Sequence, residues 1–313
     1  MGNQTTKSMR RTVKQWSNRQ RKLFLMVIPF TLFVMAFSYV PLFGLSMAFM
    51  KYRPGISFFK QEFVGMNNFR LLFSSMKDIL MVMKNTLVLS GLEILIMPLS
   101  LIFAILLSEL PWRKLAKTAQ TVSALPHYIS YILLYAVFYS LFSPTDGAVN
   151  SILRSFWGPD YTSNIMASAK YAWLVQVLVS VYKGTGYGAI MYLSAMAGID
   201  QEMYDSAKVD GAGRMARILY ITLPGVLSTF VVLLVFKIAG VLSGAGFDQY
   251  YIFQNPMTMN KLEVLDTYIY KIGLQQNNFG FATATGLLKS VVSIMLLFLA
   301  NQASKAIRGV GII

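Results

Sequence analysis

Residues 205–224, DSAKVDGAGRMARILYITLP, form a polar stretch with two glycines in an otherwise hydrophobic chain. It places charged side chains of both signs around Gly211 and Gly213, and it ends at Leu223-Pro224. Long apolar segments lie on both sides of it. Because glycine lets the chain turn, the stretch is expected to form a loop between two hydrophobic elements.

The composition is that of a membrane protein. Of the 313 residues, 55% are hydrophobic, 13% are charged and none is cysteine. Apolar runs that can cross a bilayer, at about 1.5 Å per helical residue, recur along the chain. We therefore expect an all-α membrane protein with six transmembrane helices, at residues 23–50, 79–108, 118–142, 171–197, 219–242 and 280–304.

The basic residues predict how these spans are oriented. The segments 1–22, 109–117, 198–218 and 305–313 carry 15 Lys and Arg, whereas the longer alternate loops 51–78, 143–170 and 243–279 carry 9. The density of positive charge is more than twofold higher in the first set, and cytoplasmic loops carry such an excess. Both termini and the stretch 205–224 are therefore expected in the cytoplasm. The net charge of +15 reflects this distribution of basic residues between the two sides rather than nucleic-acid binding.

The sequence lacks the common catalytic and nucleotide-binding motifs. No GxxxxGK[ST] P-loop occurs, and the single histidine, His127, cannot build a two-histidine zinc site. A Ser-His-Asp hydrolase could use it, but HYISY lies inside a predicted span and has no nucleophile elbow, so a helix-packing or interfacial role explains His127 better. TGYG at 185–188 is similar to a potassium-filter sequence, but the adjacent Lys183 would repel cations. Close packing of small residues against a neighbouring helix explains it better. We expect no enzymatic activity, no metal and no cofactor in this chain.

Polar and ionisable residues inside the spans predict a transport path. Such residues are costly in a bilayer and are functional candidates by default. The lysines outnumber the one glutamate, which indicates a polar cavity for a hydroxylated or anionic solute. The alternative for Lys84 and Lys237 is that they extend toward the headgroups. The candidate lining residues are Asn85, Glu93, Gln176, Tyr182, Lys183, Tyr187, Tyr192, Lys237 and Lys289.

The stretch 205–224 and the residues just before it predict a short amphipathic helix. Asp200 can cap its amino end, where the helix dipole also favours the acidic residues that follow. Ile199, Met203 and Ala207 recur every four residues and form one narrow apolar face. Gly211 and Gly213 then end the helix. The interpretations are an ordinary helical connector or a docking element for a cytoplasmic partner.

A resemblance favours the docking element. The permeases of binding-protein-dependent ABC importers carry E-A-A, three residues, G, nine residues, then I-x-L-P. This chain has Asp205-Ser206-Ala207, three residues, Gly211, nine residues, then Ile221-Thr222-Leu223-Pro224, so the spacing is identical. Asp and Ser replace the usual Glu and first Ala. The shorter arm of Asp205 changes only the detailed contact that this position makes.

Further segments resemble one branch of that family. FSYVPLFGLSMAF (37–49), FVGMNNFRLLF (63–73), NTLVLS (85–90), TAQTVSALPHYISYILL (118–134) and GAVNSIL (147–153) are similar to polysaccharide and oligosaccharide permeases of Gram-positive bacteria, within the maltose-type importers. The resemblance implies a second related permease, two cytoplasmic ATPase subunits that bind ATP and Mg, and an extracellular solute-binding lipoprotein. It also implies a bacterial cell-membrane location and a type I importer fold.

In that family the signature forms a coupling helix that docks on the ATPase. The residues implied to couple are Glu202, Met203, Tyr204, Asp205, Ser206, Ala207, Lys208, Asp210, Gly211, Ala212, Leu223 and Pro224. The chain then divides into a basic segment 1–22, a six-span permease domain 23–304 with its coupling loop at 198–224, and a tail 305–313. The expected function is ATP-driven import of a carbohydrate by alternating access. The alternatives are a permease of the same type for a polyol, a glycerol-phosphate or a peptide, and a secondary transporter that works without ATP.

Overall fold

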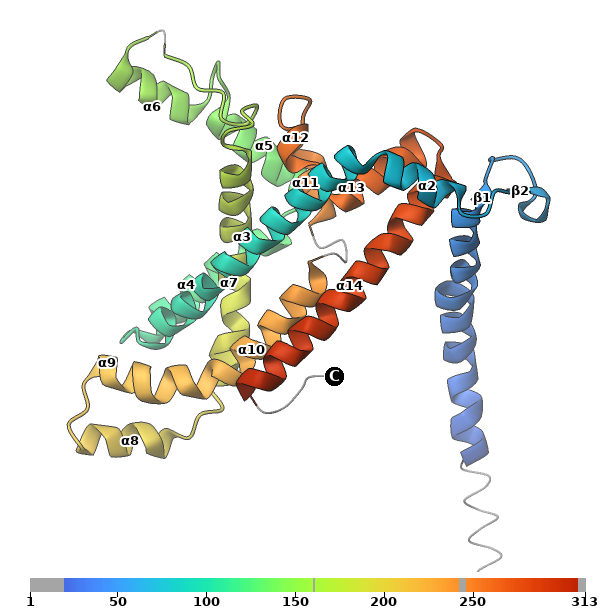
Figure 1. The fold of residues 1–313 in the computed structure, drawn as a ribbon. Helices are drawn as coiled ribbons and strands as arrows, with labels where there is room; N and C mark the ends of the chain where they lie inside the picture. Colours follow the sequence, from blue (N-terminus) through green and yellow to red (C-terminus); the bar gives the residue numbers. More distant parts are fainter. Residues whose placement is uncertain (1–19, 160, 242–245, 309–313) are drawn as a thin grey trace, which may run out of the picture.

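Long helices dominate the computed structural model, which describes residues 20–159, 161–241 and 246–308 (Figure 1). Parts of the predicted segments 1–22 and 305–313 therefore lie outside the described residues. After the first helix, Gln20–Phe49, the α-helices are α2 (Asn67–Ser74), α3 (Met76–Ser108), α4 (Arg113–Ala124), α5 (Tyr131–Phe142), α6 (Ala148–Trp157), α7 (Ala172–Met196), α8 (Gln201–Val209), α9 (Arg214–Arg217), α10 (Leu223–Gly240), α11 (Phe247–Phe253), α12 (Met259–Leu262), α13 (Leu265–Tyr270) and α14 (Phe279–Arg308).

Shorter elements fill the turns and ends of these helices. The π-helical turns are η1 (Met35–Tyr39), η5 (Ile218–Thr222) and η6 (Lys271–Gln275), and the 3₁₀ segments are η2 (Val40–Phe49), η3 (Phe58–Lys60) and η4 (Leu125–Tyr128). The strands β1 (Met50–Lys51) and β2 (Glu62–Phe63) pair antiparallel, Met50 with Phe63 and Lys51 with Glu62.

The predicted spans correspond to these long helices. Four helices are long and apolar enough to cross a membrane: Gln20–Phe49, Met76–Ser108, Arg214–Gly240 and Phe279–Leu299. The pair Arg113–Tyr128 and Tyr131–Phe142 makes a fifth span if it is counted as one. The remaining predicted span is α7, whose 25 residues include Gln176 and Lys183 and are therefore less apolar. The all-α membrane fold is confirmed.

The third predicted span, residues 118–142, is wrong as a continuous helix. Its two halves are bent by 103° at a break around Ile129. Pro126 lies in the first half, in η4, where it has no N–H to donate to the carbonyl four residues earlier, and the backbone becomes extended at Ile129, with φ −74° and ψ 132°. Ser130 restarts the helix, because its side chain accepts a hydrogen bond from the Leu133 amide.

Lys183 of α7 stabilises this break. Its ammonium donates to the carbonyl oxygens of Pro126, His127 and Ile129, the one to His127 at 2.6 Å, and lies 4.8 Å from the centre of the Tyr131 ring. Carbonyls at a helix end carry partial negative charge and have no intrahelical donor. A lysine at membrane depth thus satisfies backbone groups that lipid could not.

The TGYG stretch is part of a continuous helix and allows close helix packing, as expected. A Cβ atom on Gly186 would clash with the backbone of Ser123 in α4, and one on Gly188 would lie 2.7 Å from the Ser100 hydroxyl oxygen of α3. The ring of Tyr187 stacks on His127 at 3.7 Å between centroids. Small residues therefore bring α7 against both neighbouring helices.

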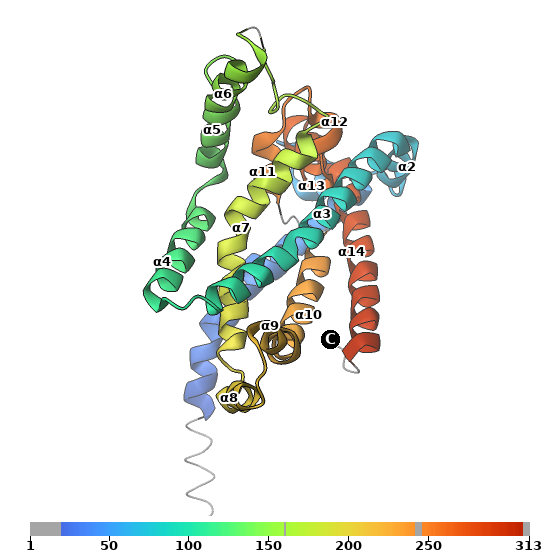
Figure 2. The ribbon, with the colours of Figure 1, turned by 90° about the vertical axis from the view of Figure 1, so that its left-hand side faces the viewer.

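The molecule has two distinct ends and one helix that stands apart. The start of the first helix, α8, α9 and the end of α14 lie at one end, and α2, β1, β2, α6 and α12 lie at the other (Figures 1 and 2). None of the apolar window of the first helix is buried, and Phe24, Phe30 and Phe37 are at least 70% exposed. Its last turns, in η2, pack against α14.

Candidate functional site

The loop between α7 and α10 forms the predicted short helix, α8, with caps at both ends. The Asp200 side chain accepts a hydrogen bond of 3.0 Å from the Glu202 amide. At the other end Gly211 has φ +76°, its amide bonds the Lys208 carbonyl at 3.1 Å, and the Ala212 amide bonds the Ala207 carbonyl at 2.8 Å. This pair of bonds around a left-handed glycine is a Schellman motif. The helix therefore ends at a position whose left-handed backbone conformation favours glycine.

The outer surface of α8 is free of the rest of the chain. None of its residues is buried, Met203 is half-exposed and Val209 is 88% exposed. Lys208 donates to the Asp205 carboxylate at 2.8 Å. That hydrogen bond holds the pKa of Asp205 below its ordinary value, so the carboxylate stays ionised at neutral pH. The exposed surface thus combines apolar side chains with fixed charges of both signs.

The inner side of the loop is fastened to the membrane helices. The Tyr204 hydroxyl and the Thr222 hydroxyl lie 2.9 Å apart, and Arg214 pairs with Glu109 of the α3–α4 connection at 3.1 Å. Ile199 packs against Gly225, where a Cβ atom would lie only 2.6 Å from its δ-methyl group. These contacts connect α8 and its loop to α10 and to the α3–α4 connection.

Leu223 and Pro224 lie inside a helix rather than at its beginning. The helical segment Arg214–Gly240 is continuous and passes through the π-helical turn η5, in which the Leu223 amide bonds the Ile218 carbonyl. Because Pro224 has no N–H, an α-helix would leave a carbonyl in the preceding turn without its donor. The wider turn accommodates this defect and places Thr222 opposite Tyr204.

A polar network crosses the bundle between α3, α7, α11 and the last turn of α10. Lys237 of α10 pairs with Glu93 of α3 at 2.5 Å, and Ser180 of α7 donates to the same carboxylate. Gln249 of α11 donates to Ser180 at 3.1 Å and to Gln176 at 3.0 Å. The network therefore joins four helices through side chains that the sequence separates widely.

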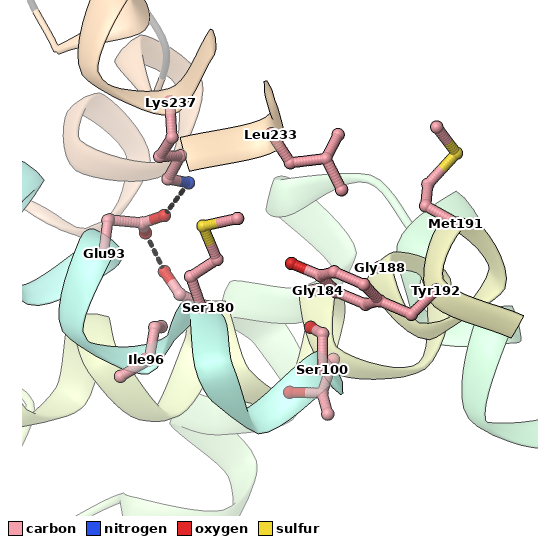
Figure 3. A pocket seen from close by; sticks show the side chains of 12 residues that line it. Glu93, Ile96, Ser100, Ser180, Gly184, Gly188, Met191, Tyr192, Leu233 and Lys237 are labelled. Carbon is pink, nitrogen blue, oxygen red and sulfur yellow. Dashed lines mark hydrogen bonds and ion pairs between the residues drawn. The ribbon is translucent and has the colours of Figure 1, made fainter. Parts of the chain in front are cut away.

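Two cavities adjoin this network. One, of about 250 Å³, is lined by Glu93, Ile96, Met97, Ser100, Ser180, Gly184, Thr185, Gly188, Met191, Tyr192, Leu233 and Lys237 (Figure 3). The other, of about 280 Å³, is lined by Ser90, Glu93, Tyr131, Phe236, Lys237, Gly240, Val241, Gly246, Gln249 and Tyr250. Glu93 and Lys237 belong to both.

Three of the nine predicted path residues line these cavities: Glu93, Tyr192 and Lys237. The other six lie elsewhere. Asn85 is buried and donates to the carbonyls of Asn260 and Glu263, and Gln176 is buried against Gln249. Lys289 pairs with Asp266 beside a separate cavity of about 810 Å³ between η2, α13 and α14. Lys183 holds the helix break, and Tyr182 and Tyr187 are largely exposed.

Sequence reasoning missed Ser100, Ser180 and Gln249 as lining residues. A signal for Ser180 was present, because Gln176, Ser180, Gly184, Gly188 and Tyr192 recur every four residues and share one face of α7. Asp266 was also missed, since the loop that contains it was expected outside the membrane. Among the described residues no group of three or more His, Asp or Glu side chains is placed to hold a metal ion.

Comparisons with known proteins agree with this geometry. The model of the family described as "Binding-protein-dependent transport system inner membrane component" matches residues 96–309. Protein LplB of Bacillus subtilis (strain 168) is 36% identical over 288 residues, which are 92% of this chain and 89% of that protein. The polygalacturonan/rhamnogalacturonan transport system permease protein YteP of the same strain is 33% identical over 92% of this chain and 88% of that protein.

A solved structure is similar over nearly the whole chain. The crystal structure of a bacterial alginate ABC transporter in complex with an alginate pentasaccharide-bound periplasmic protein contains a chain that is 32% identical, with a TM-score of 0.84. The match covers 94% of this chain and 98% of that one.

Proposed function

This chain belongs to the family of binding-protein-dependent transport system inner membrane components, and we propose that it is the transmembrane permease subunit of an ATP-driven importer for oligosaccharides or polysaccharide fragments. Among these relatives, YteP is named as a polygalacturonan/rhamnogalacturonan permease, the solved structure is of an alginate transporter, and a more distant relative, at 26% identity, is named as an arabino-oligosaccharide permease. A carbohydrate is therefore favoured over a polyol, a glycerol-phosphate or a peptide.

The observation that carries the proposal is the coupling loop. Its helix α8 is capped at both ends, exposes an amphipathic surface, and is joined to α10 through Tyr204 and Thr222. Two cytoplasmic ATPase subunits supply the energy, and one of them receives α8 in a groove. When they close on ATP and Mg, the loop moves with them and tilts α10. This chain itself hydrolyses no ATP.

The other partners follow from exposed surfaces and from the comparisons. A second, related permease covers the isolated first helix, whose apolar window has no residue buried by the described part of this chain. An extracellular solute-binding lipoprotein delivers the sugar at the end that carries α2, α6 and α12 (Figure 1). The complex lies in the bacterial cell membrane, with both termini and α8 in the cytoplasm, as the distribution of basic residues favours.

Reconstitution tests the proposal. The complex of both permeases and the ATPase subunits in liposomes, supplied with binding protein, is expected to accumulate labelled oligogalacturonides or arabino-oligosaccharides only with ATP. The isolated chain is expected to bind no ATP. Sugar uptake that persists without the ATPase subunits would instead support a secondary transporter.

A further inference from the structure

The ion pair between Glu93 and Lys237 stands between the two central cavities. Both residues line both cavities, whereas the other lining residues belong to one or the other. On α3 the order is Ser90 in one cavity, Glu93 in both, and Ser100 in the second. On α10, which runs in the opposite direction, Leu233 lies in the second cavity and Gly240 in the first. The helices therefore agree that the pair separates two chambers.

The two chambers lie at different levels of the bundle. The chamber with Gly240 is lined by Gln249 and Tyr250 of α11, and the chamber with Tyr192 is lined by the last turns of α7, which lead into α8. We call them the α11 chamber and the Tyr192 chamber. Their volumes, about 280 and 250 Å³, each suit one pyranose ring rather than a whole oligosaccharide.

The charges of Glu93 and Lys237 are paired within the chain, but a solute can replace the hydrogen bonds that they make. Lys237 and Ser180 both donate to the Glu93 carboxylate, so both charges have a partner when no solute is present. The Lys237 side chain nevertheless remains 41% exposed and that of Glu93 22%. A carboxylate can accept two hydrogen bonds side by side, and an ammonium retains further donors. A solute with adjacent hydroxyl groups can therefore replace the protein's own bonds.

Tyr192 supplies an independent sign that a ligand belongs here. Its side chain is only 1% exposed, and its hydroxyl has no hydrogen-bond partner among the described residues. Figure 3 shows the ring reaching into the chamber with its hydroxyl on the side of Glu93 and Ser180. Buried polar groups are almost always hydrogen-bonded, so an orphaned hydroxyl calls for a partner from outside the chain.

We propose that the two chambers are successive subsites for the sugar units of a saccharide, and that the Glu93–Lys237 pair is the septum between them. This inference rests on the proposed function, since it assigns the path of the same solute. A vicinal pair of hydroxyls donates to the Glu93 carboxylate, Lys237 donates to a sugar oxygen, and Tyr192 bonds the unit in its chamber. In the α11 chamber, Tyr131 and Tyr250 add aromatic side chains to the lining.

The first test is Tyr192→Phe in the complete reconstituted complex. Loss of one hydrogen bond to the sugar is expected to raise the KM for uptake roughly fivefold. The melting temperature should be unchanged or higher, because the hydroxyl has no partner to lose. The matched control is Tyr139→Phe, since Tyr139 is half-exposed and lines neither chamber. A KM equal to that of the wild type, or a lower melting temperature, would overturn the role of Tyr192.

The second test uses the absence of cysteine from this chain. In the resting complex, Ser90→Cys should react with a membrane-impermeant thiol reagent added outside, and Ser100→Cys with the same reagent added inside. Replacing both septum residues with alanine should let the outside reagent reach Ser100→Cys. Labelling of both positions from one side in the intact complex would rule out a septum. If the wild-type complex imports no saccharide, the proposed function is wrong. If the complex imports saccharide normally but one reagent labels both positions from the same side, only the septum is wrong.

Discussion

At the scale of single residues, position on a helix face decides what a polar side chain does. Along α7, Gln176, Ser180 and Tyr192 share the face that meets α3, α10 and α11, whereas Lys183 lies on the face that meets the broken span. Sequence reasoning placed Gln176, Lys183 and Tyr192 in one group of path candidates and left Ser180 out. The structure separates them because the partner of Lys183 is a backbone more than 50 residues away.

Lys183→Met is expected to destabilise the protein by about 3 kcal/mol, because it leaves the half-buried carbonyls of His127 and Ile129 at the break without their ammonium donor. Thermal unfolding of the purified chain in detergent measures this. The control is Lys84→Met, since Lys84 is exposed on α3 and its replacement should change stability by about 0.5 kcal/mol or less. Equal melting temperatures for the two variants would contradict the role assigned to Lys183.

At the scale of elements, the coupling loop is a helix whose two ends are fixed and whose outer surface is free. The Schellman motif at Gly211 fixes where α8 ends, and the π-helical turn before Pro224 fixes the direction in which α10 leaves. Both features are local, which explains why the spacing of the glycine and the Leu-Pro pair is so characteristic. Loop geometry and helix position are therefore set by the same twenty residues.

Gly211→Ala is expected to weaken coupling through the backbone alone. Nothing lies within 4 Å of the added methyl group, so the cost, about 1 kcal/mol, comes from φ +76°. Gly213→Ala is the matched control, because Gly213 is equally uncrowded and has an ordinary φ of −66°. Sugar-stimulated ATPase activity of the reconstituted complex should fall for the first variant and not for the second. Equal activities would show that the cap does not matter for coupling.

Replacement of Glu202 and Asp205 with Lys tests the outer surface of α8. Both side chains are exposed, so the variant should insert and fold normally while ATP hydrolysis no longer responds to sugar. Unchanged transport would contradict the assignment of α8 as the coupling helix.

Tyr204→Phe tests the connection between α8 and α10. Removing the 2.9 Å contact with Thr222 should leave basal ATP hydrolysis intact and lower the sugar imported per ATP. A double-mutant cycle with Thr222→Val isolates the interaction, which is expected to be about 1 kcal/mol. Additive effects of the two substitutions would mean that the hydroxyl pair transmits nothing.

Sequence patterns predicted the caps of α8 and the approximate limits of all the long helices, because these depend on neighbouring residues. They did not predict the 103° break, since Pro126 alone permits either a kink or a helix end. The choice between them depends on Lys183 and on the close approach of Gly186 to Ser123. Contacts between residues far apart in the chain produce no regular spacing of residues in the sequence. For the same reason the pairing of Glu93 with Lys237 could not be predicted.

At the scale of the whole molecule, the chain is incomplete as a bundle. α3, α7, α10 and α14 pack together, but the first helix leaves this group and exposes its aromatic side chains over most of its length (Figure 1). Helix association in a bilayer depends on van der Waals packing rather than on the hydrophobic effect. A lone helix attached at one end has little of this packing within the described part of its own chain, and we propose that the second permease supplies it.

Phe24→Ala with Phe30→Ala is expected to weaken assembly and not the chain itself. Both rings are at least 70% exposed, so their removal should leave the melting temperature of the isolated chain unchanged. The complex with the second permease should dissociate at about tenfold higher concentration, a difference of about 1.4 kcal/mol, because the rings lose their packing against that subunit. Native mass spectrometry over a dilution series measures the dissociation. A complex as stable as the wild type would mean that this helix faces lipid in the assembled importer, and a lower melting temperature of the isolated chain would mean that it packs within its own subunit.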